Sequence, residues 1–184
     1  MSEEVRAVNP AEDWDDRDEL QLPGSIHSLV TGMTTGTATE RRIAREALID
    51  IGEPAVPALV RELESSSAHV RLEAAKALAE IGEARAAPAL VRALEDGNAS
   101  VRRTAARGLI GLGRGALIPL LEALEQASDS MRLREGARRV LRALVQEGAA
   151  KEAAPVLAVL EDMEAPAEVP GVAFNVLQSL YKTG

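Results

Sequence analysis

The sequence contains no cysteine, which excludes disulfide bonds, thiolate nucleophiles and cysteine-ligated metals. Aromatic residues make up only 2% of the chain, so few side chains could stack on nucleic-acid bases. No apolar run approaches the ~20 residues that a membrane-spanning helix requires, and the first residues are acidic, unlike a secretory signal. We therefore expect a soluble cytoplasmic protein without a membrane partner.

Positive charge is also in deficit, and its distribution is uneven. The formal net charge of -8 argues against a nucleic-acid partner, because such proteins gain affinity by neutralising phosphates with clustered Lys and Arg. Residues 1–24 hold eight acidic residues against two arginines, and few large apolar residues. We expect this segment to form a mostly disordered acidic tail. Residues 101–142, in contrast, hold nine arginines against four acidic residues.

A repeat of 30 or 31 residues organises the rest of the chain. The segment VRLEAAKALAEIGEARAAPALVRALED begins at Val70 and returns in similar form from Val101. Each unit contains two runs with apolar residues three or four apart, separated by glycine, which predicts two antiparallel helices. Since such a pair cannot bury its apolar face alone, a fixed period in this range predicts a stack of helix pairs.

We predict an all-α fold, an α-solenoid of about four helix pairs plus capping helices, over residues 25–184. The repeats are expected at about 37–66, 67–97, 98–127 and 128–163, with a C-terminal capping helix at 169–182. In the fourth repeat, which matches less closely, we align Met131 with Val101 and add one residue near Arg134.

Local signals place several helix starts and faces. A short helix from Ile26 to Met33, capped by Ser25 or Gly24, is expected to cover the first end of the stack. Thr37 and Glu40 predict a capping box at the start of the first repeat. The expected buried face of that repeat's first helix consists of Ile43, Ala47, Leu48 and Ile51.

The repeated residues resemble the short HEAT-like repeat named after phycobilisome lyases. The resemblance covers about residues 40–161 and is carried by Val70-Arg71, Ala74-Ala75, Ala77-Leu78, Ile81-Gly82, Ala87-Pro88-Ala89-Leu90 and Ala93-Leu94, and by Val101-Arg102, Ala105-Ala106 and Leu109. It implies a HEAT-like α-solenoid. Because members of that family include bilin lyases and chaperone-like relatives, it also leaves the handling of a bilin or another tetrapyrrole as an alternative function.

Other HEAT-type proteins are enzymes, and the sequence lacks their reactive residues. Deoxyhypusine hydroxylases hold a di-iron site with His-Glu pairs, but neither His27 nor His69 is followed by Glu. HEAT-type DNA glycosylases use a basic face with aromatic residues, whereas Arg61, Arg92 and Glu122, at equivalent positions of the second helices, have no aromatic residue beside them. We therefore expect no enzymatic activity, no metal and no cofactor, and we keep a nucleic-acid binder as a third alternative, which the net charge disfavours.

Arginines recur at two kinds of position. Arg71, Arg102 and Arg132 follow the repeat period, and we expect each to bridge an acidic residue of the preceding turn, such as Glu95 or Asp96, in a structural role. A second set is four residues apart within first helices: Arg103 and Arg107, then Arg134, Arg138 and Arg142. We expect these two rows to lie side by side on neighbouring helices as a basic strip, which could also serve solubility alone.

These features predict a non-enzymatic protein–protein interaction scaffold or adaptor. The candidate partner-binding residues are Arg61, Arg92 and Glu122 on the inner face of the second helices, and Arg103, Arg107, Arg134, Arg138 and Arg142 on the outer face. The partner's identity is open. An acidic segment, either of a partner protein or of this chain's own residues 1–19, would complement the basic strip.

Overall fold

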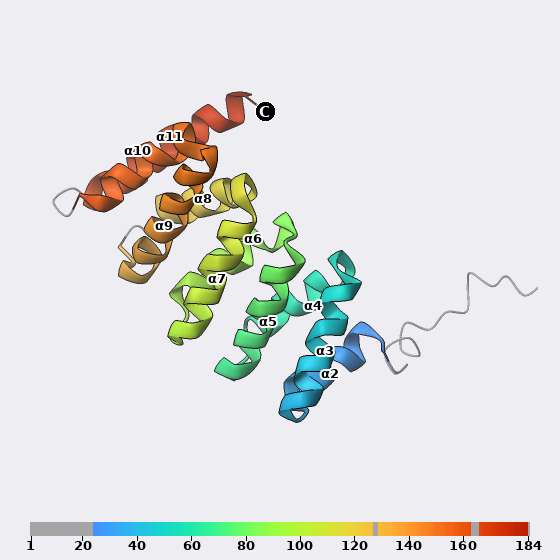
Figure 1. Ribbon diagram of the computed structural model, residues 1–184. Helices are drawn as coiled ribbons and strands as arrows, with labels where there is room; N and C mark the ends of the chain where they lie inside the picture. The colour runs from blue at the N-terminus through green and yellow to red at the C-terminus, as the bar shows by residue number, and fades with distance from the viewer. Residues whose placement is uncertain (1–23, 127–128, 163–165, 184) are drawn as a thin grey trace, which may run out of the picture.

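The computed structural model describes residues 24–126, 129–162 and 166–183, which form a solenoid of stacked helices (Figure 1). Every regular element within these ranges is helical, and the predicted α-solenoid is confirmed. The predicted acidic tail lies outside the described residues except for Gly24. None of the helices described is both long and apolar enough to cross a membrane.

The helices form two layers. The first layer contains the first helix of each repeat: α3 (Ala38–Ile51), α5 (Ala68–Ile81), α7 (Ala99–Gly111) and α9 (Met131–Leu144). The second layer contains α4 (Val56–Glu62), α6 (Ala87–Arg92) and α8 (Leu117–Gln126), each preceded by a short 3-10 turn. Helix α2 (Ile26–Thr35) packs against α3 at the first end. Successive first helices pack against one another, so their outer sides form one continuous face (Figure 1).

Side-chain caps define where the first helices begin. Ser25 caps α2, and Thr37 and Glu40 form the predicted capping box at α3, where the Thr37 N–H donates to the Glu40 carboxylate over 2.6 Å. The N-cap residues of the four first helices are Thr37, Ser67, Asn98 and Ser130, so the step grows from 30 to 31 to 32 residues. Each Arg four residues after a cap donates its backbone N–H to that cap's carbonyl.

The 32-residue step corrects the predicted alignment of the fourth repeat. Leu133, which is fully buried, is the counterpart of Val101, whereas Met131 is the first residue of α9 and is 75% exposed. The sequence could not separate the two, because an apolar residue followed by Arg occurs at both positions. Every later residue of α9 consequently takes a position different from the one expected.

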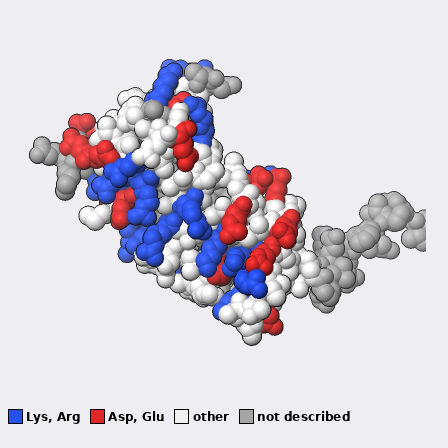
Figure 2. All heavy atoms as spheres, viewed as in Figure 1, with Lys and Arg blue, Asp and Glu red and all other residues white. Residues whose placement is uncertain are grey.

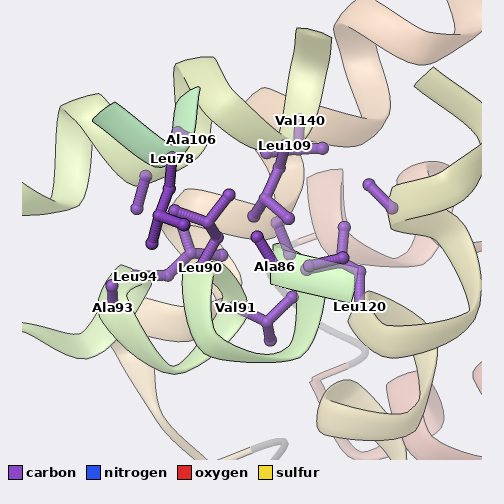
Figure 3. Packing of buried hydrophobic residues seen from close by; sticks show 14 of the residues in the cluster. Leu78, Ala86, Leu90, Val91, Ala93, Leu94, Ala106, Leu109, Leu120 and Val140 are labelled. Carbon is purple, nitrogen blue, oxygen red and sulfur yellow. The ribbon is translucent and has the colours of Figure 1, made fainter. Parts of the chain in front are cut away.

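Alanines and leucines at matching positions build the core between the layers. The residue seven places after each cap is Ala44, Ala74, Ala105 or Ala137, and the residue eleven places after it is Leu48, Leu78, Leu109 or Leu141; all are buried. Figure 3 shows Leu78 and Leu109 of the first layer meeting Ala86 and Leu90 between the layers. The small alanine side chains let neighbouring helices approach closely, as the repeat pattern predicts.

One predicted core residue is more exposed than expected. Ile43 is 53% exposed, and Ala44 takes its place in the buried face of α3. The equivalent residue of α5, Glu73, faces Arg45 on the preceding first helix. No such helix precedes α3 in the described array, and α2 does not cover Ile43. Ile118 in α8 is also exposed.

The C-terminal end departs from the simple repeat. After the π-helical segment Val145–Ala149, α10 (Ala150–Glu161) is the second helix of the predicted fourth repeat, and Pro155 lies inside it. In α4 and α6, proline instead stands in the first turn. Helix α11 (Val169–Thr183), like α4 and α6, has proline as its second residue, and α11 rather than α10 packs against α8. It therefore extends the second layer, while α10 packs between α9 and α11 (Figure 1).

Candidate partner-binding surface

The candidate residues on the second helices differ in their exposure to solvent. Arg61 and Arg92 are exposed, and Arg92 lies 3.9 Å from the Glu64 carboxylate. Glu122 is half-buried and accepts a hydrogen bond of 2.8 Å from the Tyr181 hydroxyl of α11. This hydrogen bond raises the pKa of Tyr181. Glu122 thus serves to hold the last helix against α8, while the two arginines remain accessible.

A row of structural arginines runs along the repeat, shifted from the predicted one. Its members stand four residues after each cap: Arg41, Arg71, Arg102 and Arg134. The Nη1 group donates to a carbonyl of the preceding turn in the first three repeats, namely to Gly36 over 2.6 Å, Ser65 over 2.8 Å and Asp96 over 2.7 Å. Arg41 is a member that the predicted row does not include. The predicted member Arg132 instead donates to the Glu95 carbonyl over 3.3 Å.

Asp96 forms a predicted bridge to an arginine, but its partner is Arg71, which belongs to the repeat before this turn. Arg71 binds both carboxylate oxygens of Asp96, with Nε–Oδ2 at 2.6 Å and Nη2–Oδ1 at 3.0 Å. Burial alone would raise the pKa of Asp96, but hydrogen bonds from Arg71 and from the Asn98 N–H bring it below its ordinary value. Arg71 therefore connects the turn before α5, through the Ser65 carbonyl, with the turn before α7, through the Asp96 carboxylate.

A buried ionic cluster joins α3 to α5. Glu73 is only 4% exposed and binds Arg45 of α3 and, over 2.8 Å, Lys76. Burial would raise the pKa of Glu73, but the hydrogen bonds from Lys76 and Arg45 lower it overall. Since removing one member would leave an uncompensated buried charge, Glu73 and Arg45 form a structural contact between repeats rather than an open binding group. Lys76, whose side chain is 34% exposed, is the member of this cluster that reaches the outer face.

The outer face of the first helices carries a basic strip, which we define as Lys76, Arg103, Arg107, Arg138 and Arg139. Lys76, Arg107 and Arg139 each stand nine residues after the cap of α5, α7 and α9, so they occupy the same place on three adjacent helices. Lys76, Arg103 and Arg107 line the groove between α5 and α7. Arg103 and Arg139 line the groove between α7 and α9 together with Glu135.

The arginines of α9 have different neighbours from the ones that we predicted. We predicted that Arg134, Arg138 and Arg142 would form the row beside α7, but Arg139 is the residue aligned with Arg107. Arg142 forms an ion pair with Glu161 of α10 at 2.6 Å. Arg134 and Arg138 line a groove with Val159 and Leu160, also of α10. The longer step explains the difference, since it moves each residue of α9 after Arg134 by one position relative to the predicted alignment.

The strip carries uncompensated charge. Within the described residues, Arg103, Arg107, Arg138 and Arg139 form no ion pair, and Arg103 bonds only to the Ser100 hydroxyl at 3.1 Å. Figure 2 shows Lys and Arg side chains gathered over α7 and α9, while acidic side chains are more frequent over α3 and α5. This part of the surface can therefore attract an anionic ligand without first breaking internal pairs.

The His, Asp and Glu side chains of the described surface are spread over several helices. Nowhere in the described ranges do three or more His, Asp or Glu side chains gather in a way that could hold a metal ion. His27 and His69, the two histidines of the chain, are both exposed and stand on different helices. The ionic groups of the described surface can bind and orient charged ligands through hydrogen bonds and electrostatic attraction.

Comparison with known proteins supports the repeat assignment. Residues 26–110 match the family model of HEAT repeats, a range that runs from α2 into α7. The comparison with curated proteins gives no match. The closer relation to phycobilisome lyases stays a prediction. Over residues 26–110, this α-solenoid is therefore built from helix pairs similar to HEAT repeats.

Proposed function

We propose that this protein is a non-enzymatic interaction scaffold that binds an acidic, extended segment of a partner protein on the basic strip. The observation that carries the proposal is the group of four arginines on α7 and α9 that have no ion pair within the described residues. A solenoid is suited to this role because its stacked helices present a broad surface of fixed geometry.

The spacing of the strip favours an extended ligand that crosses the helices. Packed helices lie about 8–10 Å apart, so Lys76, Arg107 and Arg139 recur at roughly that interval across the face. A single exposed ion pair contributes only about 0.2–1 kcal/mol. Measurable affinity would therefore need several contacts at once, and it would fall steeply as salt is added.

A protein segment fits the strip better than a nucleic acid does. Glu135 is exposed within the strip and would repel a continuous phosphate backbone, whereas a peptide can place a neutral residue opposite it. Phe174 and Tyr181 are the aromatic residues of the described chain, and both stand on α11 rather than beside the strip. Base stacking, the usual source of affinity for single strands, is thus missing from this face.

The proposal can be tested with the full chain and a fluorescent twelve-residue peptide that carries Asp at every third position. We expect saturable binding that weakens steeply between low and moderate salt. The double variant Arg107→Glu, Arg139→Glu should bind at least tenfold more weakly. Arg61→Glu, Arg92→Glu is the matched control, since it changes the net charge equally on the other layer and should bind the peptide nearly as well as the parent.

Two outcomes would contradict the proposal. If both charge-reversed variants lose affinity equally, the peptide is responding to net charge and not to the strip. If a labelled oligonucleotide of the same length binds more tightly than the peptide, and its binding also depends on Arg107 and Arg139, the strip is a nucleic-acid surface.

A further inference from the structure

We propose that the basic strip is also the docking site of this chain's own N-terminal acidic segment, residues 12–18, which would compete there with a partner. The inference shares the strip with the proposed function but does not depend on a partner existing. It follows from three observations: the period of the acidic residues, the spacing of the cations, and the length of chain that connects the two.

The acidic residues near the N-terminus recur at intervals of three. Glu12, Asp15 and Asp18 form one such series, and Asp13, Asp16 and Glu19 form a second, shifted by one residue. In the polyproline II conformation, a chain has three residues per turn and rises about 3.1 Å per residue, so every third carboxylate faces the same side about 9 Å further along. In that conformation, each series presents a straight row of three negative charges on one side of the segment.

The cations of the strip match that interval. Lys76, Arg107 and Arg139 occupy equivalent positions on three successive helices, each packed against the next, and packed helices are about 8–10 Å apart. Asp18, Asp15 and Glu12 can thus meet α5, α7 and α9 in turn. Arg107 and Arg139 are without an ion pair in the described chain, while Lys76 would be shared with Glu73.

The connecting chain is long enough for this arrangement within one molecule. Gly24 precedes α2, α2 packs against α3, and α3 packs against α5, so two interhelical steps of about 8–10 Å separate α2 from the near end of the strip. The six residues from Asp18 to Gly24 can span about 20 Å. A segment tethered in this way is present at high effective concentration, which compensates for weak individual contacts.

The absence of cysteine makes a direct test simple. Ala11→Cys introduces the only thiol of the chain, to which a nitroxide spin label can be attached. At low salt, we expect broadening of the backbone amide signals of α7 and α9 on the strip side, and little broadening of α4 and α6. The broadening should disappear at high salt and in the Arg107→Glu, Arg139→Glu variant, but persist in the Arg61→Glu, Arg92→Glu control.

A binding measurement separates this inference from the proposed function. A second variant of the full chain replaces six acidic residues by their amides: Glu12, Asp13, Asp15, Asp16, Asp18 and Glu19. We expect this neutralised chain to bind the acidic test peptide several-fold more tightly than the parent does. If the neutralised chain binds the peptide no better than the parent and the spin label broadens nothing on α7 or α9, the self-docking inference is wrong even if the peptide binds. If the peptide fails to bind either chain while the broadening is seen, the proposed partner site fails and the self-docking stands.

The spin-label experiment also tests the alternative occupant. Mixing isotope-labelled protein without a spin label and unlabelled protein with one reports only contacts between molecules. Broadening of α7 and α9 in this mixture, equal to that within one molecule, would show that a second copy supplies the acidic segment and would overturn docking within the chain.

Discussion

A close approach between α5 and α7 gives a quantitative test of the helix stack. A Cβ atom added to Gly108 would lie 3.1 Å from the Ala79 Cβ, 3.1 Å from the Leu90 Cδ1 and 3.2 Å from the Ala79 Cα. Gly111, in the same helix, has no heavy atom within 4 Å of such a Cβ. The pair Gly108→Ala and Gly111→Ala therefore makes the same chemical change at a crowded and at an open position.

Two effects decide the outcome of each substitution. Replacing glycine by alanine stabilises the folded state by roughly 0.5–1 kcal/mol in a helix interior, where Gly108 stands, and by less at the last residue of a helix, where Gly111 stands. Crowding at a well-packed site costs about 1–3 kcal/mol, and the Ala79 backbone cannot move as freely as the end of a long side chain. Gly111→Ala should raise stability, and Gly108→Ala should be less stable than Gly111→Ala by about 1–3 kcal/mol.

Urea denaturation followed by far-ultraviolet circular dichroism measures this difference directly, because the described chain is almost wholly helical. The slopes of the two transitions should agree, which would show that unfolding remains cooperative in both variants. In thermal unfolding, each kcal/mol corresponds to about 2–4 °C for a domain of this size. Equal midpoints for the two variants, or a higher midpoint for Gly108→Ala, would refute the close packing of α5 on α7.

Three further changes test separate contacts by the same denaturation measurement. Ala105→Leu should lower stability by about 1–3 kcal/mol, because Ala105 is fully buried between helices; an unchanged midpoint would place it elsewhere. Asp96→Asn should cost about 1–3 kcal/mol at neutral pH through the loss of the charged bond to Arg71. The folded-state pKa of Asp96 is lowered, so the contribution of Asp96 to the free energy of unfolding is present above its ordinary pKa and is lost as the pH falls through the folded-state value. The stabilities of parent and variant should therefore converge in acid. A constant difference between them from pH 6 to pH 3 would argue against this. Pro155→Ala should raise stability by up to about 3 kcal/mol, since proline inside α10 cannot donate a hydrogen bond to the Lys151 carbonyl. An unchanged midpoint would indicate that this missing hydrogen bond does not destabilise α10.

The repeat pattern was sufficient to predict the helix pairs, because their apolar residues recur where burial requires them. Ala74 and Leu78 mark the buried side of α5, and the capping box at Thr37 fixes the start of α3. The buried role of Glu73 was not predictable from this pattern, since its partner Arg45 lies on another helix and the contact depends on how α3 and α5 pack.

The site was less predictable than the fold because it depends on register. Met131-Arg132 and Leu133-Arg134 offer the same apolar–arginine pair two residues apart, and burial of Leu133 selects the second. That choice replaces Arg138 by Arg139 as the neighbour of Arg107. The Ser130 cap and the spacing to Ala137 and Leu141 were the available signals, and they favour the longer step. The pairing of α11 with α8 depends on packing between distant segments, for which the repeat carries no information.

The arginine four residues after each cap has a mechanical consequence. In the first three units this side chain fastens the helix to the loop in front of it, through bonds from Arg41, Arg71 and Arg102. Arg134 holds the same place in the fourth unit, but residues 127–128 of the turn before it lie outside the described ranges. In each of the first three units, the loop before a first helix can open only if this bond breaks, so hydrogen exchange should show the loop protected together with the helix that follows it.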